Sequence, residues 1–170
     1  MHTIAPELQV AAWLNTAQPL SLRQLRGKVV AVHAFQMLCP GCVSHGIPQA
    51  KTIRSNFDEQ DVAVIGLHSV FEHHDAMTAK ALEAFVHEYR IQFPVAIDRP
   101  SPRGAVPMTM AQYQLRGTPT LLVIDRQGRL RLNHFGRADD MQVGALIGQL
   151  LAEAPSGAEV HCDDTACSIR

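Results

Sequence analysis

An apolar run that ends at a closely spaced pair of cysteines restricts the fold of this chain more than any other segment. Residues 29–35 are β-rich and apolar, interrupted only by His33, which is the pattern of a central strand buried on both faces. A Cys-Pro-Gly-Cys motif at 39–42 follows, and residues 42–57 then carry apolar side chains at helical spacing. A second short β-branched run, residues 62–67, predicts another buried strand. The cysteines therefore begin the helix of a βαβ unit, which indicates an α/β fold.

The rest of the chain alternates between helical and strand periodicity. A loop with three prolines lies at 99–107, and residues 125–128 form a tight turn. The pattern predicts helices over 78–89 and 108–115, strands over 93–98, 120–124 and 129–135, and a last helix that begins at Asp139 or Asp140 and continues to 151. We therefore predict a three-layer α/β fold, with a central mixed β-sheet covered by helices on both faces. Residues 1–153 form one domain in this prediction, and 154–170 form a C-terminal tail.

Composition excludes several classes of partner. The 170 residues are 46% hydrophobic and 18% charged, which suits a single domain with a sizeable core. A formal net charge of -1 gives no basic surface for nucleic acid or for an anionic membrane. The longest apolar runs are far shorter than the roughly 20 residues that cross a bilayer. The first residues also lack the pattern of a secretory signal, so we expect a cytoplasmic protein.

The motif at 39–42 has a definite chemistry at this position. The first sulfur of a Cys-x-x-Cys motif at a helix N-terminus meets unpaired backbone N–H groups, which favour the thiolate form of Cys39. We predict that Cys39 is the nucleophile. Cys42 lies one turn further on and is predicted to be the resolving thiol, which attacks the mixed disulfide and releases the reduced substrate. The chemistry needs no cofactor.

Three segments in order carry a family resemblance. Residues 27–35 lead into the motif at 39–42, and Gly117-Thr118-Pro119-Thr120 precedes a hydrophobic strand about 75 residues later. Over residues 5–152 this arrangement resembles the thioredoxin fold, and most closely the TlpA-like and ResA-like thiol-disulfide oxidoreductases of the AhpC/TSA redoxin group. The resemblance implies a cis Thr118–Pro119 bond facing the cysteines, with the backbone of Thr118 binding a substrate strand. It also implies a disulfide-bearing protein or a small thiol as substrate, a thiol reductant system as electron source, and an antioxidant role.

The chain departs from this family at three positions. Leu38 stands where the family usually has tryptophan. His33 stands where thioredoxins carry a buried acid. Pro48 lies six residues after Cys42, whereas five is usual, so the start of the helix is expected to contain an extra residue.

Histidines supply the candidates for proton transfer. A neutral imidazole at His33 is a competent general base for Cys42, although a buried packing role fits the same position. His68, Glu72, His73 and His74 follow a strand whose carboxyl end opens toward the edge of the sheet that carries Cys39. We expect these four side chains to lie in a solvated loop, with proton shuttling or metal binding as the functional alternatives. A copper site of His134 with the two cysteines is disfavoured, because the relatives that bind copper space their cysteines differently.

Two alternatives to the oxidoreductase remain open. One is a slow peroxidase of the peroxiredoxin type, although the sequence lacks the Pro-x-x-x-Thr-x-x-Cys motif that activates peroxide. The other is a non-enzymatic metal-binding protein that uses Cys39, Cys42, Cys162 and Cys167, with His161 nearby. The tail pair, Cys162 and Cys167, is also a candidate second redox pair, because the four residues between them allow a local disulfide.

Overall fold

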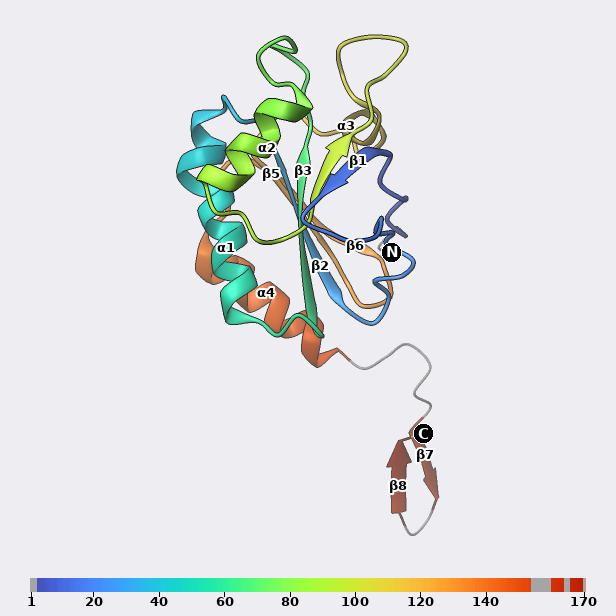
Figure 1. Cartoon of the computed structure of the whole chain (residues 1–170). Helices are drawn as coiled ribbons and strands as arrows, with labels where there is room; N and C mark the ends of the chain where they lie inside the picture. Colours follow the sequence, from blue (N-terminus) through green and yellow to red (C-terminus); the bar gives the residue numbers. More distant parts are fainter. Residues whose placement is uncertain (1–2, 154–159, 164–165, 170) are drawn as a thin grey trace.

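A mixed six-stranded sheet forms the centre of the protein in a computed structural model that describes residues 3–153, 160–163 and 166–169 (Figure 1). The strand order is β1-β4-β3-β2-β5-β6, in which β2, β3 and β4 are mutually parallel and the other three strands are antiparallel to their neighbours. All seven residues of β2 are buried, as predicted for the central strand. The strands are β1 (Val10–Leu14), β2 (Val29–Phe35), β3 (Val62–His68), β4 (Val95–Asp98), β5 (Thr120–Ile124) and β6 (Leu130–Phe135).

Five helical segments connect the strands and cover the sheet. They are η1 (Cys42–Gly46), α1 (Ile47–Asn56), α2 (Ala79–Glu88), α3 (Met108–Gln112) and α4 (Asp140–Ala152). The side chains of Thr78 and Asp139 cap α2 and α4, because they accept the N–H groups of Ala81 and Gln142. The expected alternation of strands and helices is therefore confirmed, and so is the predicted α/β class.

The two faces of the sheet are covered differently. One face packs against α1, α2 and α4, with Phe35, Leu82 and Ile147 in its core. The other face is covered by the short α3 and by the N-terminal segment, which contributes Ala5 and Leu22. Helices thus lie on both faces, as predicted, but irregular chain does much of the covering on the second.

The structure adds two elements that the sequence pattern did not predict. Residues 10–14 form β1, an edge strand that pairs antiparallel with β4. The tail contains a hairpin of β7 (Val160–Asp163) and β8 (Ala166–Ile169). Among the described residues, no helix has the length and hydrophobicity of a membrane span.

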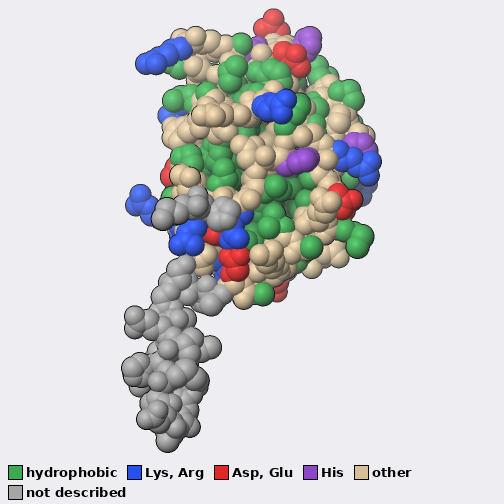
Figure 2. Space-filling model, turned by 180° about the vertical axis from the view of Figure 1, so that it is seen from behind, with side chains coloured by type: hydrophobic (Ala, Val, Ile, Leu, Met, Phe, Trp, Pro, Cys, Tyr) green, Lys and Arg blue, Asp and Glu red, His purple; other side chains and the backbone are tan. Residues whose placement is uncertain are grey.

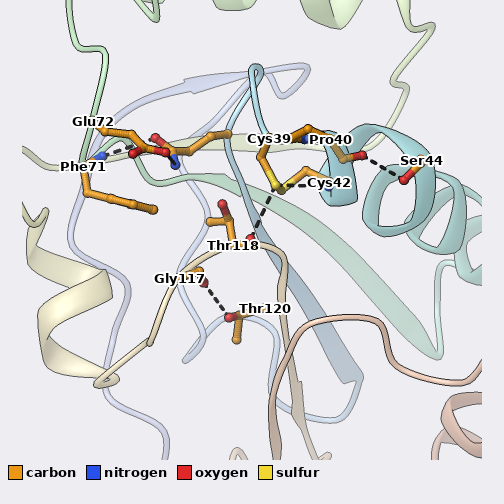
Figure 3. Close-up of a disulfide and its surroundings, with 10 residues drawn as sticks. Cys39, Pro40, Cys42, Ser44, Phe71, Glu72, Gly117, Thr118 and Thr120 are labelled. Atoms are coloured by element: carbon orange, nitrogen blue, oxygen red, sulfur yellow. Dashed lines mark hydrogen bonds between the residues drawn. A yellow bond between two sulfur atoms is a disulfide. The ribbon is translucent and has the colours of Figure 1, made fainter.

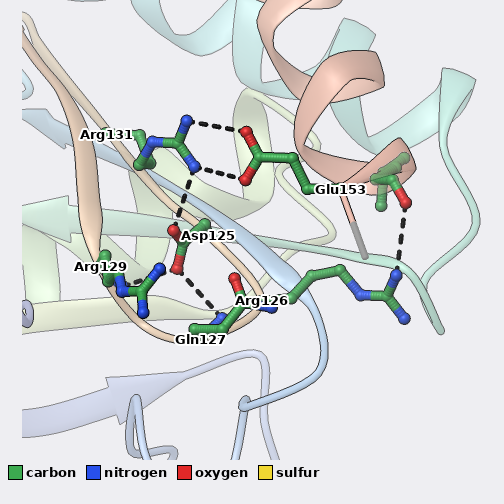
Figure 4. Close-up of polar contacts among 7 residues, drawn as sticks. Asp125, Arg126, Gln127, Arg129, Arg131 and Glu153 are labelled. Carbon is green, nitrogen blue, oxygen red and sulfur yellow. Dashed lines mark hydrogen bonds and ion pairs between the residues drawn. The ribbon is translucent and has the colours of Figure 1, made fainter. Parts of the chain in front are cut away.

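An ion cluster fixes the end of α4 to the β5–β6 hairpin (Figure 4). Arg131 on β6 donates to Asp125 at 3.2 Å and to both carboxylate oxygens of Glu153 at 2.6 and 2.8 Å. Asp125, which is only 1% exposed, also accepts the N–H groups of Gln127 and Arg129 in the turn. This cluster orients α4, whose other end lies near the cysteine motif.

Candidate active site

Cys39 lies between β2 and η1, and Cys42 is the first residue of η1; the two are joined as a disulfide with their Cα atoms 5.2 Å apart (Figure 3). Cys42 is fully buried, whereas Cys39 is partly exposed. Only Cys39 can therefore meet an incoming substrate. This asymmetry fits the predicted division into a nucleophile and a resolving thiol.

Two backbone groups lie close to the sulfur of Cys39. The N–H of Cys42 points at this sulfur from 3.2 Å, and the carbonyl oxygen of Thr118 lies 3.4 Å from it (Figure 3). In the dithiol form the amide stabilises a thiolate, and the carbonyl accepts the S–H of a neutral thiol. The site therefore has a partner for each protonation state of Cys39.

Pro119 packs against the beginning of the helix. The Thr118–Pro119 peptide bond is cis. A Cβ atom at Gly41 would lie 3.2 Å from Cδ of Pro119, and one at Gly46 would lie 3.3 Å from its Cβ. Both glycines thus allow a close approach that larger residues would obstruct. The carbonyl oxygen of Thr118 thus lies beside Cys39, and Pro119 packs against Gly41 and Gly46.

The helix after Cys42 begins with a π-turn. The N–H of Ile47 bonds to the carbonyl oxygen of Cys42, five residues earlier, and η1 then continues as α1. A π-turn accommodates one more residue than an α-helical turn. The extra residue predicted from the position of Pro48 is therefore confirmed.

His33 lies beneath this turn and is nearly completely enclosed. Its side chain is 3% exposed, and its Nε2 has no hydrogen-bond partner among the described residues. Burial lowers the pKa of His33 to about 4, so the imidazole is neutral at pH 7. The ring lines a cavity of about 120 Å³ together with Gly46 and Pro119, and exposed residues such as His45 and Arg137 form its outer wall. The cavity is large enough for water.

The four polar residues expected in a loop after β3 divide into two groups. His68 is not in the loop but is the last residue of β3, 2% exposed, with its ring centroid 5.3 Å from that of Phe35. Burial lowers the pKa of His68 to about 4. Glu72, His73 and His74 are exposed, as expected for a loop, and Glu72 accepts a 3.5 Å hydrogen bond from Gln36. The expectation of a solvated position was wrong for His68.

The remaining residues considered as metal ligands are His134 and the two cysteines of the tail. Within residues 3–153 no group of three or more His, Cys, Asp or Glu side chains could hold a metal ion. Nε2 of His134 lies 3.1 Å from the carbonyl oxygen of Arg137. In the tail, Cys162 directly opposes Cys167 in the register of the β7–β8 hairpin. The side chains of this tail pair lie outside the described residues.

Comparisons with known proteins agree with this geometry. Residues 1–133 match the model of the AhpC/TSA family. Protein DipZ of Mycobacterium tuberculosis is 30% identical over 162 residues, which are 92% of this chain but only 22% of DipZ. ResA, a thiol-disulfide oxidoreductase of Halalkalibacterium halodurans, is 25% identical over 137 residues, covering 81% of this chain and 70% of ResA.

Solved structures show the same fold. The thioredoxin-like superfamily protein SPOA0173 is 59% identical, with a TM-score of 0.87 over 89% of this chain and 97% of that one. A thiol-disulfide isomerase from Corynebacterium glutamicum is 52% identical, with a TM-score of 0.86 over 90% and 98% of the two chains. The fold is thioredoxin-like, as the sequence resemblance implied.

Proposed function

The chain belongs to the AhpC/TSA family, and from this premise we propose that it is a thiol-disulfide oxidoreductase that cycles Cys39 and Cys42 between dithiol and disulfide. The observation that carries the proposal is the unequal exposure of two bonded cysteines at the head of a helix, beside Thr118 and Pro119. Named relatives such as ResA and the Corynebacterium glutamicum isomerase support it.

The reaction follows from the positions of the two sulfurs. The Cys39 thiolate attacks a substrate disulfide, forms a mixed disulfide and releases one substrate thiolate. Cys42 then attacks Cys39, which closes the Cys39–Cys42 bond and releases the second substrate thiolate. The substrate gains two electrons, and a thiol reductant returns two electrons to the protein. We propose a cytoplasmic location, and in a reducing cytosol the protein would act as a reductant.

The surface favours a polypeptide or small thiol over a highly charged partner. Leu38, which is 59% exposed, offers an apolar contact directly beside Cys39. On the face drawn in Figure 2, acidic, basic and histidine side chains are dispersed among apolar ones. Recognition by backbone pairing at Thr118 needs no strong electrostatic field.

Trapping the intermediate tests this proposal. With Cys42→Ser, a disulfide-bonded peptide should remain covalently attached to Cys39, because no thiol is placed to resolve the mixed disulfide. Intact-mass analysis and peptide mapping should find one adduct per chain. Wild-type protein should accumulate none. An adduct on Cys162 or Cys167, or no adduct, contradicts the assignment.

We propose in addition that His33 accepts the proton of Cys42 during resolution. Cys42 is fully buried, and the neutral imidazole of His33, with an unpartnered Nε2, faces a cavity that reaches the exposed residues around η1. A neutral imidazole can take up the thiol proton and pass it to water in this cavity.

His33→Leu should slow resolution of the mixed disulfide about 10²-fold at pH 7, the scale of general base catalysis. In this variant the rate of resolution should rise with pH, because no base takes the proton of Cys42 and the reaction depends on the fraction of Cys42 that is already ionised. Single-turnover quench experiments separate this step from the first attack by Cys39, which should keep its rate. His33→Asp should restore much of the loss. An unchanged pH profile in His33→Leu would indicate a packing role only.

We also propose that Cys162 and Cys167 form a second redox pair. Directly opposed residues in an antiparallel hairpin have Cα atoms about 4.5 or 5.5 Å apart, and both values suit a disulfide. Two electrons from the Cys39–Cys42 dithiol would reduce this disulfide and leave Cys39–Cys42 oxidised. Peptide mapping of the oxidised protein should find the Cys162–Cys167 link. Stoichiometric metal in protein purified without chelator would instead favour the metal-binding alternative.

A further inference from the structure

A cation and an aromatic ring lie together beside the turn that carries Thr118. Cζ of Arg116 is 5.4 Å from the ring centroid of Phe135, the last residue of β6. Arg116 is exposed, and Phe135 is 44% exposed. The distance is that of a cation–π contact, which holds the guanidinium over the ring and leaves the N–H donors at its edge free for a ligand.

The same ring packs onto the turn beside the reactive sulfur. A Cβ atom at Gly117 would lie 2.9 Å from Cε2 of Phe135, so the ring is in close contact with the residue before Thr118. The carbonyl oxygen of Gly117 is held by Thr120 Oγ1 at 2.7 Å, and that of Thr118 lies 3.4 Å from the sulfur of Cys39 (Figure 3). The ring that positions the guanidinium is therefore part of the wall of the substrate site.

The charge of Arg116 is not neutralised within the protein. No carboxylate among residues 3–153 forms an ion pair with it. An exposed acid, Glu72, follows β3, whereas Phe135 ends β6. The strand order β3-β2-β5-β6 places the cysteine motif, which follows β2, between these two positions. One side of the motif is thus basic, and the other side carries an acid.

Building on the proposed function, we propose that Arg116 binds an acidic side chain of the substrate, two residues away from the cysteine that reacts with Cys39. In an extended strand, side chains two residues apart point the same way and are separated by about 7 Å. Arg116 is likewise two residues from Thr118, so a strand paired at Thr118 brings such a side chain within reach. A carboxylate accepts two parallel hydrogen bonds from a guanidinium. The preferred substrates are therefore peptides with an acidic residue on one side of the cysteine.

Peptides that carry their cysteine as a mixed disulfide with 2-thiopyridine are suitable probes, because this leaving group is uncharged. The Cys39 thiolate attacks the peptide sulfur, and the bond to the pyridyl sulfur breaks. The pyridyl sulfur leaves with the electron pair and takes a proton from water, which gives pyridine-2-thione. Its absorbance reports the rate of the first attack. Four peptides of otherwise equal sequence carry aspartate or asparagine two residues before or two residues after the cysteine.

Reduced full-length protein should react about 3-fold faster with one of the two aspartate peptides than with its asparagine counterpart, which is the scale of an exposed ion pair. The other aspartate peptide should show no gain, because its carboxylate lies on the side of Glu72. Rates of dithiothreitol with the same four peptides correct for their intrinsic reactivity. Salt at about 0.5 M should remove the gain, since it screens exposed charges.

Two variants with the same change of charge assign the effect. Arg116→Gln should abolish the gain, which is a ratio of rates within one protein and is not imitated by a general loss of activity. Arg129→Gln, at an exposed position between β5 and β6 at the other end of β5, should keep it. Equal rates for all four peptides, a gain with both aspartate peptides, or a gain that survives in Arg116→Gln would overturn the inference. If Cys39→Ser released thione as fast as the wild type, the proposed exchange activity would be wrong, and this inference with it.

Discussion

Replacing Cys39 with serine should lower the rate of disulfide reduction by at least about 10³-fold, since a serine hydroxyl is not ionised at neutral pH and cannot attack a disulfide as a thiolate does. Cys42 cannot substitute for it, because its side chain is fully buried. Reduction of insulin by the reduced protein, corrected for the rate with dithiothreitol alone, is the appropriate measurement.

Two variants accompany this experiment. Cys42→Ser should keep the first thiol release while losing multiple turnover, and Ser55→Ala, at an exposed position on α1, should match the wild type. If Cys39→Ser kept more than about a tenth of the wild-type turnover, another nucleophile would be responsible. Combining it with Cys162→Ser and Cys167→Ser would then show whether the tail pair supplies that nucleophile.

Mild acid should destabilise the protein strongly through two buried histidines. The pKa values of His33 and His68 fall to about 4 on folding because burial disfavours their charged form, whereas both are near 6.5 in the unfolded chain. Between pH 4 and pH 6.5 the unfolded protein therefore binds more protons than the folded protein does. The stability that both groups give is complete above pH 6.5 and is lost as the pH falls toward 4. At pH 5 the free energy of unfolding should be lower than at pH 7.5 by about 2 kcal/mol for each histidine.

Urea denaturation of the oxidised protein at the two pH values measures this loss. His68→Phe and His33→Leu should each remove about half of it. His87→Gln changes an exposed histidine and should leave the pH dependence as it is. A pH dependence that is equally steep in the double variant His33→Leu, His68→Phe would contradict the assignment to these groups.

The sequence predicts the elements whose patterns are strong. Residues 29–35 are apolar throughout, and they form the fully buried β2. The extra residue of η1 is implied by comparison with the family, in which the proline usually lies five residues after the second cysteine and not six. Residues 10–14 form β1 without a clear strand pattern, since two alanines are exposed at an edge and the strand exists through its pairing with β4.

The site is less predictable than the fold where it depends on contacts between distant segments. His68 follows an apolar run, and its burial depends on the register that pairs it with Phe35 on β2. The cation–π contact beside Thr118 joins segments on either side of β5, which no local pattern brings together. Cys39, Cys42, Thr118 and Pro119, by contrast, form recognisable motifs, and the structure places them side by side.

The close packing of Pro119 limits how the cysteine motif can be redesigned. Pro40 is exposed, so an engineer can exchange it with little steric consequence. Gly41 is different, because a Cβ atom there would lie 3.2 Å from Cδ of Pro119, and a Cβ atom at Gly46 would lie 3.3 Å from the Cβ of the same proline. The two positions between the cysteines are therefore not equivalent: a change at the first leaves Pro119 in place, and a change at the second requires Pro119 to shift by a few tenths of an ångström.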